Sequence, residues 1–103
     1  DKTTSPTSAV ALSSIAPADG STGAVATVVL TFNNAISTEN VFITLASDGS
    51  IIAGTKAWDS TRKILTFTPT TAFTAAKHYV NIVSVVDIYG QALANTITDF
   101  TVA

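Results

Sequence analysis

Short runs in which apolar and polar side chains alternate are the feature that most constrains this chain. In residues 27–33, TVVLTFN, the side chains of Val28, Leu30 and Phe32 fall on one face of an extended strand. The same two-residue period recurs along the chain, whereas no long run shows the 3.6-residue period of an amphipathic helix. The pattern therefore predicts an all-β protein.

Seven such runs, separated by turn-forming residues, predict seven strands. They cover residues 11–17, 27–33, 40–47, 51–58, 64–69, 79–86 and 96–102. Asp48 and Gly49 predict a hairpin between the third and fourth strands, because both residues tolerate a positive φ. Many short strands at this spacing are typical of an antiparallel β-sandwich.

The inward-facing positions of these strands supply the predicted core. Its members are Val28, Leu30, Phe32, Ile43, Leu45, Trp58, Leu65, Phe67, Tyr79, Val83, Phe100 and Val102. The strand 79–86 contains a conflict. With Tyr79 inward, strict alternation also turns Asn81 inward and leaves Val80 and Ile82 outside. A β-bulge or a second covered surface would resolve it, and the sequence leaves both open.

Composition excludes several classes of function. The chain has 103 residues, enough for one domain, a net charge of −2 and only 12% charged residues. It therefore lacks the basic field that holds nucleic acid. No apolar run approaches the roughly 18 residues of a membrane helix, so membrane insertion is not expected. Cysteine is absent, which excludes disulfides and zinc–thiolate clusters.

Two regions of different character divide the chain. Residues 1–10, DKTTSPTSAV, are rich in Thr and Ser and are broken by Pro6, which predicts a linker or a frayed N-terminal approach. Residues 11–103 form the predicted sandwich domain. Heavy use of Thr, Ser and Ala with few Lys and Glu residues favours an extracellular β-rich protein.

Four stretches resemble the bacterial Ig-like domain family: IAPADGSTG, VVLTFNNAI, the long run ILTFTPTTAFTAAKHYVNIVSVVDIYGQAL, and FTV. The matching positions are Pro17, Asp19, Gly20, Thr31, Phe32, Leu65 to Pro69, Tyr79, Asp87, Gly90 and Leu93. Gln91 stands where the family usually has asparagine. The resemblance implies an Ig-like, Greek-key sandwich of about seven strands. It also implies a repeated module of secreted and surface-anchored bacterial proteins, among them surface-layer proteins and adhesins.

Asp87 in SVVDIYGQAL has two interpretations. As a functional residue it binds a metal or acts as a general base. As a structural residue it accepts backbone N–H bonds within a turn in which Gly90 has a positive φ. The spacing Asp-x-x-Gly after a long apolar strand favours the structural interpretation, because it needs no partner from elsewhere.

Calcium is the strongest metal alternative, since it takes six to eight oxygen ligands. Threading the strands up and down places Glu39, Asp59 and Asp87 at one pole with the N-terminus, and Asp19 and Asp48 at the other. The first three are the calcium candidates. No short segment carries clustered acids, so we predict no cofactor and keep calcium as the open alternative.

No catalytic residues are predicted, and the chain is not expected to be an enzyme. His78 is the only histidine, which excludes a multi-histidine zinc site, and no G-x-S-x-G elbow accompanies it. We expect His78 to be a partly exposed corner residue. Tyr79, next to it, is interpreted as a structural tyrosine corner.

Trp58 and Tyr89 are the ligand or interface candidates, because both fall near one pole and could stack on sugars. Trp58 is expected at the core edge, and Tyr89 is expected to be exposed. The sequence thus favours a non-catalytic Ig-like module of a multidomain bacterial cell-surface protein, with a surface-layer protein as the favoured parent. Such a module supplies spacing, rigidity and contacts with neighbouring domains and lateral protein copies. The alternative is an adhesin or carbohydrate-binding accessory module, with a cell-wall polymer or polysaccharide as its partner.

Overall fold

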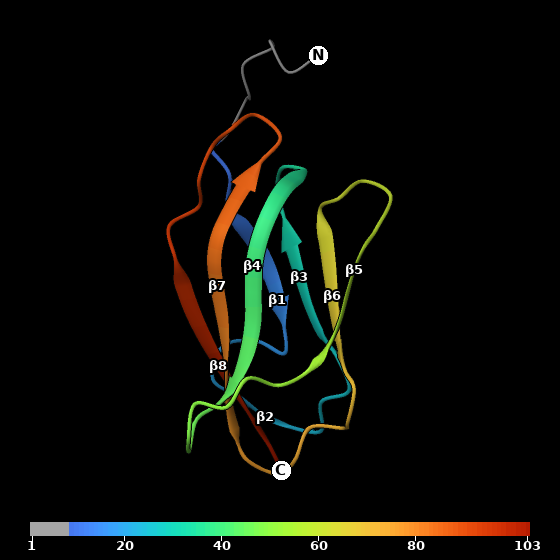
Figure 1. Ribbon diagram of the computed structural model, residues 1–103, viewed down its shortest axis with the longest axis vertical. Helices are drawn as coiled ribbons and strands as arrows, with labels where there is room; N and C mark the ends of the chain where they lie inside the picture. The colour runs from blue at the N-terminus through green and yellow to red at the C-terminus, as the bar shows by residue number, and fades with distance from the viewer. Residues whose placement is uncertain (1–8) are drawn as a thin grey trace.

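The computed structural model describes residues 9–103, which form two four-stranded β-sheets packed face to face (Figure 1). The strands are β1 (Leu12–Ala16), β2 (Ser21–Gly23), β3 (Val28–Phe32), β4 (Ile36–Leu45), β5 (Gly54–Trp58), β6 (Ile64–Pro69), β7 (Lys77–Asp87) and β8 (Thr96–Val102). The described part of the chain contains no helix. The predicted all-β sandwich is therefore confirmed, with eight strands in place of seven.

The two sheets have different strand orders. The first sheet runs β1-β3-β6-β5 and the second runs β2-β8-β7-β4. Neighbouring strands are antiparallel, except that β2 runs parallel to β8. The chain changes sheet at the β1–β2, β2–β3, β3–β4, β4–β5 and β6–β7 connections.

The strand that the prediction missed is β2, which lies in the segment expected to be a loop. It has only three residues, too few for an alternating pattern, and it forms because its backbone pairs with Phe100, Thr101 and Val102 of β8. The start of β4 was also predicted too late, at residue 40. Two register shifts between Ile36 and Asn40 interrupt its alternation, so the sequence pattern hides its first residues.

The turn predicted at Asp48 and Gly49 forms, but it does not join two long strands of one sheet. Gly49 has a φ of 74°, and its N–H donates to the carbonyl of Leu45 at 2.8 Å. Only Thr44 and Ile51 form a bridge across this turn. The chain then crosses to the first sheet, where β5 begins at Gly54, so the predicted strand 51–58 is divided.

The core lies between the sheets and draws on both. Of the predicted core residues, those that are buried are Val28, Leu30, Phe32, Ile43, Leu65, Phe67 and Phe100. Trp58 and Val102 are partly buried against this cluster, and Leu45 is half-buried. Val10 is also buried, so the core extends into the segment predicted as an N-terminal approach. Residues 1–8 of that segment lie outside the described residues.

The prediction that Tyr79 and Val83 point inward is wrong. In β7 the inward side chains are those of His78, Val80 and Ile82, followed by Val85 and Asp87. The inward-facing positions change from even to odd residue numbers at a β-bulge at Ser84, whose φ is 54°. The bulge resolves the conflict over Asn81, which faces outward while Val80 and Ile82 are buried.

The connections gather at two poles of the sandwich (Figure 1). The Asp87 pole holds the β3–β4, β5–β6 and β7–β8 connections and the start of the described chain. The His78 pole holds the β1–β2, β2–β3, β4–β5 and β6–β7 connections and the C-terminus. The predicted separation of the acids holds for Asp59 and Asp87 at the first pole and for Asp19 and Asp48 at the second. Glu39 lies within β4 and not in a loop.

Candidate functional site

Asp87 ends β7 and is 1% exposed. Its Oδ1 accepts the backbone N–H groups of Tyr89 and Gln91 at 3.0 and 2.8 Å. Its Oδ2 accepts the side-chain amides of Gln91 at 2.7 Å and of Asn34 at 3.1 Å. Gly90 has a φ of 86°. The structural interpretation of Asp87 as a turn residue is confirmed.

Two opposing effects set the pKa of Asp87. Burial raises the pKa, because it disfavours the charged form. Hydrogen bonds from Gln91, Asn34 and Tyr89 outweigh burial and leave the pKa below its ordinary value. The carboxylate is therefore held ionised as an acceptor. A general base at neutral pH has the opposite property, a pKa raised toward the working pH.

The Asp59 side chain caps the β5–β6 turn. Its Oδ1 accepts the backbone N–H groups of Lys63 and Ile64, and its Oδ2 accepts the Thr61 hydroxyl at 2.7 Å. The Thr61 hydroxyl is the main cause of the lowered pKa of Asp59. Asp48 accepts the hydroxyl and the backbone N–H of Ser50 in the same way, which lowers its pKa.

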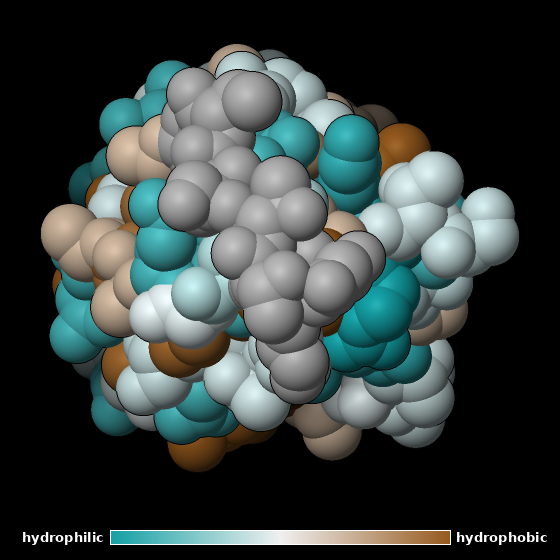
Figure 2. Space-filling model, turned by 90° about the horizontal axis from the view of Figure 1, so that it is seen from above, coloured by the Kyte–Doolittle hydropathy of each residue, from teal (hydrophilic) through white to brown (hydrophobic). Residues whose placement is uncertain are grey.

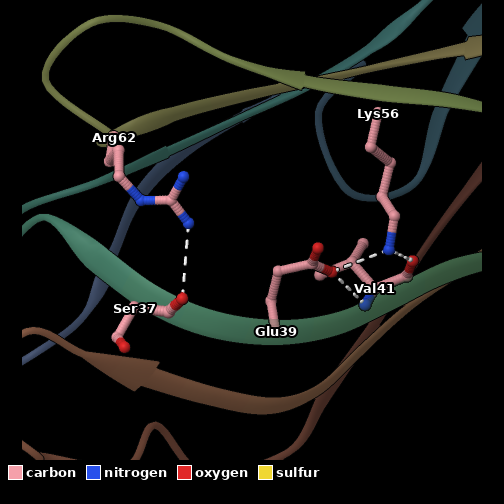
Figure 3. A network of polar contacts seen from close by, with 5 residues as sticks. All are labelled: Ser37, Glu39, Val41, Lys56 and Arg62. Atoms are coloured by element: carbon pink, nitrogen blue, oxygen red, sulfur yellow. Dashed lines mark hydrogen bonds and ion pairs between the residues drawn. The ribbon is translucent and has the colours of Figure 1, made fainter.

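Glu39 and Lys56 form an ion pair between the two sheets, with Nζ and Oε1 2.9 Å apart (Figure 3). Lys56 projects from β5 in the first sheet, and Glu39 lies on β4, an edge strand of the second. The same Lys56 Nζ donates to the carbonyl of Val41 at 3.1 Å, and the Val41 N–H donates to Glu39 Oε1 at 2.7 Å. Both backbone groups of Val41 are thus occupied by side chains.

Arg62 occupies the beginning of the same edge (Figure 3). Its Nε donates to the carbonyl of Ile36 at 2.8 Å, and its Nη2 donates to that of Ser37 at 3.3 Å. Near the end of β4, the segment after the Asp48 turn supplies the partners, since Ile52 N–H donates to the Ile43 carbonyl. An edge strand normally presents unpaired backbone groups to other chains. Here these contacts close the edge of β4.

The three calcium candidates are engaged separately by these contacts. Glu39 pairs with Lys56, Asp59 caps its own turn, and Asp87 binds Asn34 and Gln91. Within residues 9–103, no group of three or more His, Cys, Asp or Glu side chains is placed to hold a metal ion. The structure therefore does not bring the predicted ligand set together.

The two aromatic candidates differ in their surroundings. The Trp58 ring packs against Phe32, with centroids 6.1 Å apart, and the Arg62 guanidinium lies 5.0 Å above it. Tyr89 is 39% exposed. Among the described residues, no ring contact joins Trp58 to Tyr89. Viewed from the Asp87 pole, hydrophobic residues are scattered among hydrophilic ones (Figure 2). A shared aromatic platform is therefore not formed in this structure.

His78 differs most from its prediction, because it is 0% exposed and not a partly exposed corner residue. Its ring stacks on Phe100, with centroids 5.1 Å apart and an interplanar angle of 6°. The Phe73 ring meets it edge-on at 5.1 Å. The Tyr79 side chain instead faces outward beneath Lys77. Within the described chain its hydroxyl has no hydrogen bond to upstream backbone, so the predicted tyrosine corner is wrong.

Sequence reasoning missed the roles of Lys56, Arg62 and His78. Nothing local marks the two cations, because their partners lie on another strand of the other sheet. The sequence did contain a pattern that indicates a buried His78. Along a strand, His78 faces the same side as Val80 and Ile82, two apolar residues that the prediction of an inward Tyr79 placed on the outer face.

The bacterial Ig-like domain family has a model that matches residues 6–102, so the chain belongs to this family. A comparison with curated protein sequences found no match. No helix in the described part of the chain is long and apolar enough to cross a membrane.

Several solved structures share the fold at low sequence identity. PcoC, a methionine-rich copper resistance protein from Escherichia coli, has a TM-score of 0.78 and 18% identity, covering 93% of this chain and 100% of its own. CopC from Methylosinus trichosporium OB3b has a TM-score of 0.77 and 15% identity, covering 90% and 92%. Surface layer protein SbsC, domains 1–6, has a TM-score of 0.68 and 15% identity, covering 92% of this chain and 14% of its own. At these identities the likeness concerns the fold alone.

Proposed function

We propose that this domain is a non-catalytic Ig-like module of a multidomain protein of the bacterial cell surface, of the surface-layer kind. In that role it supplies spacing and rigidity and contacts neighbouring domains and lateral copies. The observation that supports this most is the use of the acidic side chains. Each acid that the sequence singled out is bound within the fold: Asp19 to Asp99 N–H, and Glu39, Asp48, Asp59 and Asp87 as described above.

The closed edge of β4 supports the same proposal. A module that carries load between neighbours gains from a sandwich whose backbone groups are paired internally, because an open edge pairs with other chains at random. The Glu39–Lys56 pair and the Arg62 contacts join the two sheets on this side. The fold likeness to SbsC domains is consistent with such use.

Copper handling is not part of the proposal, although PcoC is described as a copper resistance protein. Copper favours thioether, thiolate and imidazole ligands. This chain contains no Met and no Cys, and the Nδ1 of its one histidine is bound to the Ala76 carbonyl inside the core. The donor set therefore does not fit.

The test compares three forms of the full-length protein that contains this domain: unaltered, lacking residues 9–103, and with these residues replaced by an unrelated β-sandwich of similar length. Electron microscopy of the purified proteins measures whether ordered sheets form. We expect deletion to abolish sheets. Rescue by the unrelated sandwich would assign the domain to spacing, and failure to rescue would assign it to lateral contacts. Unchanged assembly after deletion contradicts the proposal.

A carbohydrate-binding or adhesin module is the second candidate, favoured by the exposure of Tyr89 and Ile88 at the Asp87 pole. Sugar stacking needs an accessible aromatic face. Titration of the ¹⁵N-labelled domain with cell-wall polymers and polysaccharides tests this candidate. Amide shifts confined to residues 87–91 and abolished in Tyr89→Ala would favour it. No shifts with any polymer would exclude binding at this pole.

A further inference from the structure

The His78 pole contains a pocket of about 290 Å³. It lies between the β4–β5 and β6–β7 connections, and the residues that line it include Ile51, Ile52, Ala72, Phe73 and His78. Its volume is near the lower end of ligand pockets, which begin at about 300 Å³. A water molecule takes roughly 30 Å³ of the liquid, so the pocket is large for a single water.

His78 is one of the residues that line the pocket, and the hydrogen bonding of its imidazole is incomplete. Nδ1 lies 3.1 Å from the Ala76 carbonyl, which can only accept, so Nδ1 carries the hydrogen. In the neutral ring Nε2 is then an acceptor. Within the described residues, Nε2 is buried and has no hydrogen-bond partner. Buried polar groups are nearly always paired, so an orphaned acceptor on a residue that lines a pocket indicates a missing donor.

The ring cannot easily turn toward solvent to find that donor. It is stacked on Phe100 on one face and contacted by the edge of Phe73. Ile51, Ile52 and Phe73 make the pocket wall largely apolar, and the threonines of the β6–β7 connection add hydroxyl groups. The lining residues include no Asp, Glu, Lys or Arg, so no charged ligand is matched by the site.

We propose that this pocket binds a small neutral molecule with an apolar body and one O–H or N–H donor, which completes the hydrogen bonding of His78 Nε2. Nε2 itself has no exposed surface, so binding includes a small movement of the surrounding side chains. The site is separate from the β4 edge and from the Asp87 pole, and it does not depend on the role proposed for the whole domain.

The test uses phenol and toluene, which have similar size and shape but differ in the hydroxyl donor. The ¹⁵N-labelled domain is titrated with each, and the amides of residues 51–53 and 70–74 and the imidazole Nε2 resonance of His78 are followed. We expect phenol to shift Nε2 and to bind about fivefold more tightly than toluene, the factor that one net hydrogen bond of ordinary strength gives.

Three variants sharpen the result. His78→Phe keeps a ring that can stack but removes the acceptor, so the preference for phenol should disappear. Thr98→Val changes a buried core hydroxyl outside the pocket and should leave the preference unchanged. Ala72→Phe, at an exposed lining position, should block both probes without disturbing the core, and it remains informative if His78→Phe does not fold.

Equal affinity for phenol and toluene in the unaltered domain would overturn the proposal, as would no shift with either probe. A persistent water on Nε2 that phenol does not displace would also overturn it, since the missing donor would then be an ordered water only.

Discussion

The side-chain amide of Asn34 donates to Oδ2 of Asp87 across a distance of 3.1 Å, although the two residues are 53 positions apart. The bond joins the β3–β4 connection to the end of β7. The Ile88 N–H donates to the Ala35 carbonyl at 3.0 Å beside it. Asp87 therefore organises its own turn and also fastens a second connection to it, which explains why a turn residue is fully buried.

Replacing Asp87 by Ala should lower the free energy of unfolding by about 2–3 kcal/mol, because it leaves several donors without their charged acceptor. Asp48→Ala is the matched control, since Asp48 holds a turn that is exposed, and it should change stability little. Urea unfolding followed by circular dichroism measures both. Equal losses in the two variants would mean that Asp87 makes only a local turn.

The stability of the domain should fall at acid pH, and Asp87 should cause part of the fall. Its folded pKa lies below that of the unfolded chain, roughly 3.9. The stabilisation is therefore present above the unfolded pKa and is lost as the pH falls through the folded pKa. Urea midpoints between pH 2 and 7 should decline less steeply for Asp87→Asn than for the unaltered domain. Parallel curves would contradict this assignment.

Thr98→Val should stabilise the domain by about 1 kcal/mol, because within the described chain its buried Oγ1 has no partner and valine has the same shape. Thr44→Val is the control. The Thr44 Oγ1 accepts the Asn81 amide at 3.1 Å, so the same chemical change there should destabilise by about 1 kcal/mol. Thermal unfolding measures whether the melting temperature rises in Thr98→Val and falls in Thr44→Val. Loss of stability in Thr98→Val would reveal a partner for this hydroxyl.

Opening the edge of β4 should promote self-association more than unfolding. The double variant Lys56→Ala, Arg62→Ala removes the donors to the Ile36, Ser37 and Val41 carbonyls. The Glu39 side chain is only 11% exposed, but it keeps the Val41 N–H as a donor when Lys56 is removed, so the monomer should remain folded. Sedimentation velocity at increasing concentration should show dimers or larger species. Lys63→Ala is the control, because it also removes a positive charge but leaves the contacts to β4 in place. If Lys63→Ala associates as strongly as the double variant, closure of the β4 edge is not the cause.

Gly54 should tolerate no side chain. A Cβ at this position would lie 2.4 Å from the Thr68 carbonyl oxygen and 2.5 Å from the Phe67 ring. Gly54→Ala should therefore cost at least about 2 kcal/mol, the range of overpacked sites. Gly49→Ala is the control. Its positive φ strains any side chain, but the space around it is open, so the loss should be about 1 kcal/mol. Chemical denaturation measures the free energy of unfolding of both variants.

The predictions from sequence succeeded where the controlling interactions are local. Alternation in β3 and β6 placed Leu30 and Leu65 in the core, since a strand turns successive side chains to opposite faces. The Asp-x-x-Gly spacing identified the turn at Asp87, because its backbone donors lie within four residues.

Prediction failed in β7 because one extra residue reverses which side chains face inward. The bulge at Ser84 has no residue signature of its own, and its N–H donates to Asn95 Oδ1 on the β7–β8 connection at 3.3 Å. The prediction that Tyr79 points inward and that His78 is partly exposed was therefore wrong. The predicted return strand 51–58 failed similarly: the turn at Asp48 forms, but nothing in it shows that the chain leaves the sheet after Ile52.

The amino-acid order alone determined that two β-sheets enclose an apolar core and that Asp87 ends a strand in a turn. These outcomes depend on residues within a few positions of one another. Only the tertiary structure decided that Asn34 reaches Asp87, that Lys56 and Arg62 close the edge of β4, and that His78 is buried beside a pocket. Each of these depends on residues of different strands or connections meeting, and their positions are set by how the two sheets pack.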